Sequence, residues 1–348
     1  MADAPRPCTL ILGGGLALGA YHAGAVRTLL ADETLDIQAI GGASIGAIMA
    51  ALIAGTPPDD RIAALDAFWA TVGRETGNSF LPSAGGVRHL ANWGSALTSR
   101  TAGVANMFRP RWPGEREEDG PCPALYSNEP LRRLLADRID FARLNSAGPR
   151  LCISTTDVLA GEVVLFDTAA GDVIALEHVL ASGALMPAFS PMQVGERLLA
   201  DGGFAANAPL EPFLASDRIQ PSTPLVILVD LFSPDDAAPT SLEASLARSQ
   251  DLLFAMQTRL RLEALVRERA LEARIAPEVA GTDLFHISYR PLPHEAGSEK
   301  AYDLSRATLR DRQAVGTRDA ARLLRRMCDV GLSSEAGLRV HRIGHDGP

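Results

Sequence analysis

The chain lacks several features that would place it in common protein classes. None of its apolar runs approaches the ~18 consecutive residues that a membrane-spanning helix needs. Its first residues lack the charged-then-apolar layout of a secretion signal. The four cysteines are scattered and show no metal-ligand spacing. We therefore expect reduced thiols, a cytoplasmic location, and neither a metal nor a cofactor.

The chain also has fewer basic than acidic residues. The sequence has 33 Lys and Arg residues against 42 Asp and Glu residues, which gives a formal net charge of −9. This balance argues against nucleic-acid binding and provides no electrostatic attraction to anionic lipid. The 348 residues are enough for a large core in one or two domains, and the apolar content of 47% is typical of a globular protein.

The segment of residues 42–46, with the sequence Gly-Ala-Ser-Ile-Gly, lies between an alternating stretch at 35–40 and an apolar helical stretch at 47–54. Strand, Gly-x-Ser-x-Gly and helix together are the context of a nucleophile elbow. Glycines are needed on both sides because a Cβ would crowd the crossover from strand to helix. The hydroxyl would then stand exposed near the positive end of a helix. We therefore predict that Ser44 is a nucleophile.

A glycine run at residues 13–15 follows a short apolar strand at 8–12 and precedes a helical stretch at 20–30. Backbone N–H groups in such a loop can bind an anion, either a phosphate or the oxyanion of an acyl-transfer intermediate. The dinucleotide pattern is not met, because the spacing from Gly15 to Gly19 is one residue too long and no acid ends the second strand. The loop favours an oxyanion hole, with nucleotide binding as the lesser alternative.

A third stretch, Asp201-Gly202-Gly203, follows a short strand. Alone it is a common turn sequence. Together, the three stretches resemble the patatin-like phospholipase family, whose pattern is a glycine-rich oxyanion loop, a Gly-x-Ser-x-Gly elbow and a distant Asp-Gly-Gly. The resemblance covers about residues 8–232. Further positions that fit it are Gly24, Pro187, Phe189, Pro191, Asn207 and Pro209.

The resemblance implies a Ser–Asp dyad. Ser44 would attack an ester carbonyl and Asp201 would accept its proton, which requires a carboxylate in a partly dry site. The resemblance further implies that the oxyanion is held by the backbone N–H groups of Gly14, Gly15 and Leu16. The residues that support the two motifs would be Gly42, Gly46, Gly202 and Gly203. The chain departs from the family at Leu16 and Leu18, where the family usually carries a glycine and then Arg or Lys.

A Ser-His-Asp triad is the alternative mechanism, and it needs a histidine after Asp201. The candidates are His286, His294, His341 and His345. His286 lies in a strand-like run, where a structural role is more common, and the others lie in a proline-rich loop or a polar tail. None has a recognisable catalytic context, which agrees with a dyad.

Strands and helices alternate along the chain, which predicts a three-layer α/β/α sandwich with a central, mostly parallel sheet. We predict an acyl hydrolase domain at 8–232, with a loop or lid insertion at 76–122. A mainly helical C-terminal extension is expected at 233–330, followed by a loose tail at 331–348. Within the extension, 241–275 reads as one long helix. We expect its apolar stripe, which includes Leu242, Leu246, Leu253, Met256, Leu260 and Leu265, to pack on the sheet, with contact to a membrane or to a second copy as the alternatives.

The leading hypothesis is a serine lipid acyl hydrolase that acts on phospholipids or related lipid esters, with transient contact to a membrane surface. One alternative is a hydrolase of small esters or thioesters on the same fold. Another is a scaffold protein with weak or lost catalysis, which the leucine at position 16 favours and the intact Ser44 and Asp201 oppose. A homo-oligomer is compatible with the sequence.

Overall fold

The computed structural model describes residues 4–76, 86–112, 123–215, 223–332 and 335–344. Its strands are β1 (Arg6–Leu12), β2 (Leu35–Ala43), β3 (Arg109–Pro110), β4 (Tyr126–Ser127), β5 (Arg150–Asp157), β6 (Glu162–Asp167), β7 (Met192–Val194), β8 (Arg197–Asp201), β9 (Leu225–Asp230), β10 (Thr282–Ser288) and β11 (Leu338–Arg342).

The α-helices are α1 (Ala20–Leu30), α2 (Ile45–Ala54), α3 (Arg61–Val72), α4 (Gly86–Ala102), α5 (Glu129–Arg138), α6 (Phe141–Ser146), α7 (Leu176–Ser182), α8 (Glu211–Leu214), α9 (Leu242–Ile275) and α10 (Arg306–Val330). Short 3₁₀ turns connect some of these elements, and those that matter for the site are η1 (Leu16–Gly19), η5 (Gly202–Phe204) and η6 (Gly297–Tyr302).

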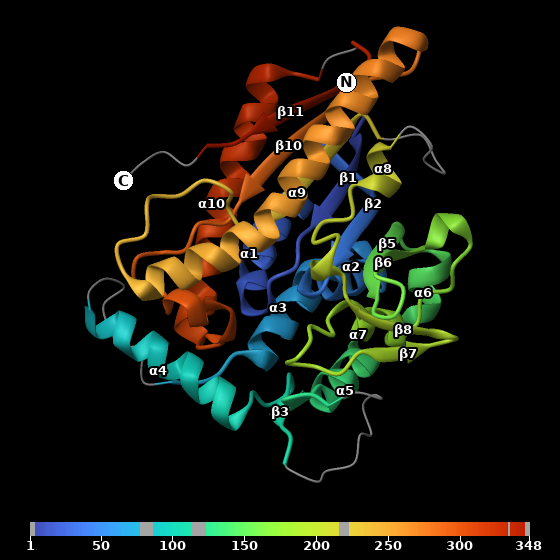
Figure 1. Cartoon of the computed structure of the whole chain (residues 1–348). Coiled ribbons are helices and arrows are strands. Elements are labelled where there is room, and N and C mark those ends of the chain that lie inside the picture. The colour runs from blue at the N-terminus through green and yellow to red at the C-terminus, as the bar shows by residue number, and fades with distance from the viewer. Residues whose placement is uncertain (1–3, 77–85, 113–122, 216–222, 333–334, 345–348) are drawn as a thin grey trace.

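A nine-stranded sheet forms the centre of the molecule, in the order β11-β10-β9-β1-β2-β5-β8-β7, with β6 paired to β5 beside this path (Figure 1). All neighbours from β11 to β5 in this order run parallel. Strands β6 and β8 run antiparallel to β5, and β7 runs antiparallel to β8. The mostly parallel sheet explains why the carboxyl ends of β1 and β2, which carry the glycine loop and the elbow, lie side by side.

Helices cover both faces of this sheet. Leu10 and Leu12 belong to the larger core cluster with residues of α1, α2, α3 and α10, whereas Ile11 belongs to a second cluster with residues of α8 and α9. Successive residues of a strand point to opposite faces, so β1 is apolar on both sides. The predicted three-layer α/β/α architecture is therefore confirmed.

The C-terminal region is helical and also adds strands to the sheet. β10 pairs with β9, and β11 pairs with β10. Helix α10 packs along α1, where a Cβ on Gly24 would lie 1.9 Å from the Gln313 carbonyl oxygen and one on Gly316 would lie 2.1 Å from that of Tyr21. The two helices can approach this closely only because both positions are glycine.

The segment 331–348, which the sequence predicts as a loose tail, differs from that expectation where it is described. Leu338–Arg342 is β11, and Leu338 and Val340 join the core cluster below α9. The guanidinium of Arg339 donates to both carboxylate oxygens of Asp283 on β10, at 2.9 and 2.7 Å. The sequence did not predict this strand, because its run of alternating residues is short and the partners of its polar residues lie on the neighbouring strand.

Helix α9 matches the predicted helix at 241–275, but most of the leucines in its apolar stripe face away from the sheet. Leu242, Leu246, Leu253 and Leu260 are exposed, so the prediction that this stripe packs on the sheet is wrong for them. The buried residues of α9 are Asp251, Ala255, Thr258, Leu262, Leu265 and Arg269. The inward face is half polar because its charged groups have buried partners, and hydropathy alone therefore does not identify it.

The insertion predicted at 76–122 contains more regular structure than a loop. Residues 86–102 form α4, and Met107 and Phe108 are buried in the core, while Trp93 is exposed. Residues 77–85 and 113–122 lie outside the described residues. A lid role for the segment stays a prediction.

Candidate active site

Ser44 is the single residue between β2 and α2, and its backbone is strained. Its φ is 53° and its ψ is −123°, a combination that residues with a side chain rarely adopt. A Cβ on Gly42 would lie 2.5 Å from the Gly46 carbonyl oxygen, and one on Gly46 would lie 2.1 Å from that of Leu12. Both flanking positions therefore require glycine, and the sharp strand-to-helix turn has the form that the Gly-x-Ser-x-Gly pattern predicts.

A second serine, Ser182, holds the backbone of the elbow in place. The Ser44 N–H donates to the Ser182 hydroxyl oxygen at 2.9 Å, and that hydroxyl donates to the carbonyl oxygen of Ser154 at 2.8 Å. Ser182 is fully buried at the end of α7. Sequence analysis did not single it out, because a serine at the end of a helix carries no signal of such a role.

Asp201 ends β8 and is buried next to Ser44. One of its carboxylate oxygens accepts a hydrogen bond from the Gly203 N–H at 2.7 Å. Burial raises the pKa of Asp201 to about 7, against the lowering effects of the Gly203 N–H and of the nearby Ser44 hydroxyl. A carboxylate with this pKa is a far better proton acceptor at neutral pH than an exposed aspartate.

The glycine loop between β1 and η1 lies against the elbow. Gly15 and Leu16 have positive φ angles of 157° and 50°, which turn their N–H groups out of the regular strand. The structure records no hydrogen bond from either N–H to any described residue. The N–H of Gly14, by contrast, donates to the Asn207 carbonyl oxygen at 3.1 Å. Gly14 is therefore not a free oxyanion donor, contrary to the sequence prediction, and its backbone ties the loop to the segment after Asp201.

These residues line one cavity of about 320 Å³. Ser44, Asp201 and the three loop residues meet at its wall, and the rest of the lining is mainly apolar. The remaining residues are Gly183, Leu185, Ala188, Phe189, Asn207, Phe232, Gln250, Leu253, Phe254, Ser298, Ala301 and Tyr302. The last six belong to α9 and η6, so the C-terminal region forms part of the cavity wall, which no motif in the sequence indicated.

The sequence model of the patatin-like phospholipase family matches residues 10–214, which is more than half of the chain. The chain belongs to the patatin-like phospholipase family. The matched segment runs from the first strand, through the elbow and the Asp201 turn, to the end of α8.

Two patatin-like phospholipase domain-containing proteins of Caenorhabditis elegans are similar over short segments. M110.7 is 48% identical over 48 residues, and ZK370.4 is 42% identical over 60 residues. These segments cover 14% and 17% of the present chain but only 4% of either nematode protein. The likeness is thus confined to a small part of each relative.

Two solved bacterial structures are similar at low sequence identity. VipD from Legionella pneumophila is 13% identical with a TM-score of 0.38, and the match covers 90% of this chain and 68% of VipD. ExoU from Pseudomonas aeruginosa, solved in complex with SpcU, is 19% identical with a TM-score of 0.32. That match covers 78% of this chain and 53% of ExoU.

The described histidines of this patatin-like chain lie away from Ser44 and Asp201. None of the described histidines lines the cavity that contains Ser44. His286 is buried on β10 with its Nε2 3.9 Å from an Asp230 carboxylate oxygen, and burial lowers its pKa to about 4. Burial lowers the pKa of His22 to about 3. His345 lies outside the described residues. The described geometry therefore does not assemble a Ser44–His286 triad.

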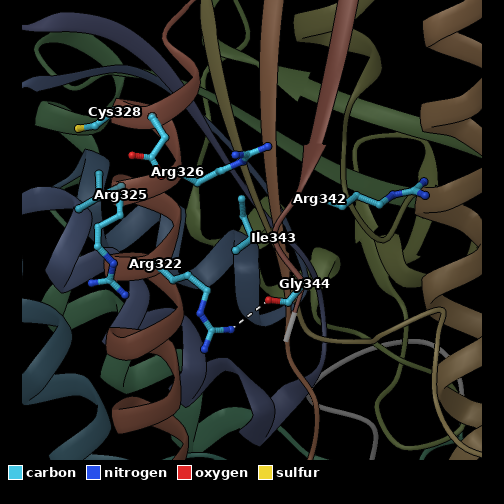
Figure 2. A pocket seen from close by; sticks show the side chains of 9 residues that line it. Arg322, Arg325, Arg326, Cys328, Arg342, Ile343 and Gly344 are labelled. Atoms are coloured by element: carbon cyan, nitrogen blue, oxygen red, sulfur yellow. Dashed lines mark hydrogen bonds between the residues drawn. The ribbon is translucent and has the colours of Figure 1, made fainter. Parts of the chain in front are cut away.

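A second cavity of about 550 Å³ lies at the end of α10 next to β11. Its lining includes Arg322, Arg325, Arg326 and Arg342 but neither Ser44 nor Asp201. Arg322 donates to the Gly344 carbonyl oxygen at 3.0 Å, and Figure 2 shows Arg342 pointing away from the arginines of α10. The guanidinium groups do not converge on one point, so this cavity lacks the geometry of an anion site.

The described helices contain none that is both long enough and apolar enough to cross a lipid bilayer. The longest, α9, carries charged residues throughout its length.

Proposed function

We propose that this chain is a serine lipid acyl hydrolase that cleaves carboxylic esters of phospholipids or related lipids with a Ser44–Asp201 dyad. The observation that carries the proposal is that Ser44, on its strained elbow, and the buried Asp201 carboxyl lie together at the wall of one apolar cavity. Family membership supports the lipid substrate class, and the dyad geometry supports the ester chemistry.

In the proposed first step, Ser44 Oγ attacks the ester carbonyl while Asp201 takes the hydroxyl proton. The raised pKa of Asp201 makes that transfer less unfavourable than transfer to an exposed carboxylate, while Asp201 stays partly ionised near neutral pH. The proton then passes from Asp201 to the departing alcohol, and an acyl ester of Ser44 remains. Water attacks this ester with Asp201 again as the base, which releases the fatty acid and restores the serine.

The oxyanion of each tetrahedral intermediate would accept hydrogen bonds from the N–H groups of Gly15 and Leu16. Backbone donors of this kind are preorganised and do not depend on side-chain identity. The leucine at position 16, where the family usually carries glycine, therefore keeps the donor, and its side chain adds apolar surface to the cavity. The N–H of Gly14 instead holds the loop in place through Asn207.

The cavity suits the acyl chain of a lipid. Phe189, Phe232, Phe254 and Tyr302 contribute large apolar side chains to its wall, and a chain of methylene groups gains free energy from burial against them. Because α9 and η6 contribute half of these residues, we propose that the 8–232 segment and the C-terminal region act as one catalytic unit. A cytoplasmic location is part of the proposal, in line with the reduced thiols of Cys8 and Cys152.

The test is labelling with a fluorophosphonate probe followed by identification of the modified peptide. Wild-type protein should carry the label on Ser44 and should release fatty acid from phosphatidylcholine vesicles. Ser44→Ala should lose the label and should lose activity by a factor on the order of 10⁶, as with other serine nucleophiles. Ser249→Ala, at an exposed serine of α9, is the matched control and should behave as wild type.

Labelling at another serine, or wild-type turnover by Ser44→Ala, would overturn the assignment of the nucleophile. Hydrolysis of p-nitrophenyl acetate without any release of fatty acid from vesicles would instead favour a small-ester hydrolase. The absence of both label and turnover would favour a scaffold role.

A further inference from the structure

Helix α9 presents a row of exposed leucines to the outside of the molecule. Leu242, Leu246, Leu253 and Leu260 are 78%, 51%, 67% and 58% exposed. Their spacings of four and seven residues place them on one side of the helix. Single exposed leucines need no explanation, but a continuous apolar row on an otherwise charged helix marks a contact surface.

The row of exposed leucines on α9 extends to the cavity that contains Ser44. Leu253 is both an exposed member of the row and part of the cavity wall. Phe204 is 44% exposed and follows Gly203, where an added Cβ would lie 3.4 Å from the ring of the cavity residue Phe254. Through Leu253, the exposed leucine row is therefore continuous with the apolar lining that leads to Ser44.

Helix α4 adds a second exposed apolar side next to the first turn of α9. Val87, Leu90, Trp93 and Leu97 are exposed, and they recur at helical spacing. His89 of α4 lies 3.6 Å from Glu243 of α9, and Arg100 of α4 donates to Glu299 of η6 at 2.9 Å. The two helices thus flank the turn η6, which lines the cavity (Figure 1).

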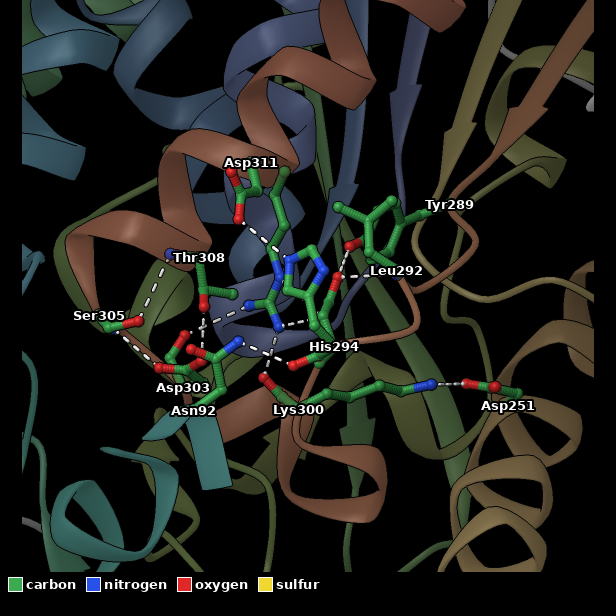
Figure 3. A network of polar contacts seen from close by, with 12 residues as sticks. Asn92, Asp251, Tyr289, Leu292, His294, Lys300, Asp303, Ser305, Thr308 and Asp311 are labelled. Atoms are coloured by element: carbon green, nitrogen blue, oxygen red, sulfur yellow. Dashed lines mark hydrogen bonds and ion pairs between the residues drawn. The ribbon is translucent and has the colours of Figure 1, made fainter. Parts of the chain in front are cut away.

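A buried polar network holds α4, η6 and α9 in this arrangement. Lys300 of η6 pairs with Asp251 of α9 at 2.5 Å, and the Asn92 side chain of α4 donates to the His294 carbonyl oxygen at 2.9 Å (Figure 3). Arg312 of α10 donates to Glu295 and to the Lys300 carbonyl oxygen. The exposed apolar residues therefore lie on a rigid frame.

The charge of this surface indicates which kind of apolar partner fits it. Between Leu242 and Leu260, α9 carries two acidic residues, Glu243 and Asp251, and two basic ones, Arg248 and Arg259. The α9 segment has no net charge. The two arginines of α4, Arg88 and Arg100, are paired with Asp311 and Glu299, and the whole chain has a net charge of −9. Anionic lipid would be repelled at long range, whereas a zwitterionic surface imposes no such cost.

We infer that this surface docks the protein on a zwitterionic phospholipid bilayer. The docking face is defined as the four leucines of α9 with Phe204, together with the exposed apolar residues of α4. Contact with lipid through this face would bring the cavity mouth against the bilayer, so that an acyl chain passes from lipid to cavity without crossing water. The inference rests on the proposed function, because it names how the lipid substrate reaches Ser44.

The same helix offers a matched control at its other end. Leu271 and Ile275 are 57% and 84% exposed on the same side of α9, but neither lines the cavity. Leu246→Gln/Leu260→Gln and Leu271→Gln/Ile275→Gln therefore make the same chemical change at two distances from the mouth. Exposed positions keep the risk of unfolding low in both variants.

Binding is measured by sedimentation with large phosphatidylcholine vesicles in a Ser44→Ala background, which separates binding from hydrolysis. Leu246→Gln/Leu260→Gln should lower the partition coefficient at least about tenfold, because two leucines no longer leave water. Leu271→Gln/Ile275→Gln should change it less than about twofold. Leu90→Gln/Leu97→Gln on α4 should also weaken binding severalfold. Binding should not fall in high salt.

In the active enzyme, Leu246→Gln/Leu260→Gln should lose vesicle hydrolysis by the same factor and keep its turnover of a short soluble ester. Equal loss of binding in the two α9 variants would overturn the inference, as would binding that requires anionic lipid. A dimer seen by sedimentation equilibrium and lost in Leu246→Gln/Leu260→Gln would assign the face to a second copy. Vesicle binding by a wild-type protein that releases no fatty acid would refute the proposed function and leave the docking face intact.

Discussion

The Nζ atom of Lys300 lies 2.5 Å from a carboxylate oxygen of Asp251, and both side chains are buried. Lys300 is the only lysine of the chain. The pair joins η6 to α9 (Figure 3). These two elements together supply the outer wall of the cavity beside Ser44. A buried charge is tolerated only when a partner compensates its desolvation, so each residue depends on the other.

Lys300→Met should therefore destabilise the protein by about 3 kcal/mol, since it leaves the Asp251 carboxylate buried without its cation. The measurement is the free energy of unfolding from urea denaturation. Asp251→Leu/Lys300→Met removes both charges and should recover most of that loss. If Lys300→Met and wild type unfold at the same urea concentration, the pair does not hold the two elements together.

The pH dependence of hydrolysis should follow Asp201. As the base, it must be ionised, and burial raises its pKa to about 7. We expect kcat/KM for a soluble ester to fall about tenfold per pH unit below about 7 and to level off above it. Asp201→Asn should nearly eliminate activity, because an amide cannot accept the serine proton.

Histidine variants provide the control for this profile. His178→Gln and His286→Gln should keep both the activity and the position of the pH transition, since burial lowers the pKa of each ring and neither lines the cavity. Loss of activity in a folded His286→Gln protein would instead identify a triad with Asp201 as the orienting acid.

The same carboxyl group should give stability a defined dependence on pH. The folded-state pKa of Asp201, about 7, exceeds the ordinary 3.8, so the folded protein binds a proton that the unfolded chain releases. Its contribution to stability is complete below about pH 4 and is lost as the pH rises to about 7. Asp201→Asn removes the cost of a buried charge and should be more stable than wild type at pH 8 by roughly 2–4 kcal/mol.

Urea denaturation of wild type and Asp201→Asn at pH 5 and pH 8 checks this sign. The advantage of the variant should be smaller at pH 5, where the wild-type carboxyl group is mostly protonated in the folded protein. An advantage that is equal at both pH values would mean that Asp201 titrates like an exposed aspartate.

Gly14→Ala should inactivate the enzyme while leaving it folded. A Cβ at this position would lie 2.5 Å from the Asn207 side-chain oxygen and 3.0 Å from the Ser44 Cβ, so the loop or the elbow must shift. Displacement of a reacting group by about 1 Å costs on the order of 100-fold in rate. We expect at least that loss in kcat for a soluble ester, with an unchanged circular dichroism spectrum.

Gly183→Ala is the comparison, because Gly183 lines the same cavity but its added Cβ would meet only the Leu180 carbonyl oxygen at 3.7 Å. It should retain activity within about twofold. Comparable losses in the two variants would mean that the cavity responds to added volume in general and not to movement of the loop.

The sequence predicts a residue of the cavity when a short segment around that residue determines its geometry. The elbow at Ser44 depends on two flanking glycines, and the turn after Asp201 depends on two following ones, so both are visible locally. The engagement of the Gly14 N–H by Asn207 could not be read in this way, because it depends on two loops that are far apart in the sequence.

The residues of α9 and η6 that form the outer wall of the cavity were not predicted from the sequence, for a related reason. Leu253 and Tyr302 reach the site only through the packing of α9 and η6, and no motif marks them. On α9 the leucine row suggested the inward face, yet the helix buries Asp251 and Arg269. Asp251 pairs with Lys300 of η6, and Arg269 pairs with Glu272 of α9 and donates to the Ala280 carbonyl oxygen beyond the helix. Hydrophobic periodicity identifies the buried face only when the core is apolar throughout.

Strand β10 matters for any attempt to isolate the predicted hydrolase domain at 8–232. It covers one side of β9, whose residues Leu225–Asp230 are all buried. A protein shortened to residue 232 would present β9 as an open edge with unpaired backbone groups and five consecutive aliphatic side chains. Such an edge is a template for pairing between molecules, so the C-terminal strands protect the sheet of that domain against aggregation.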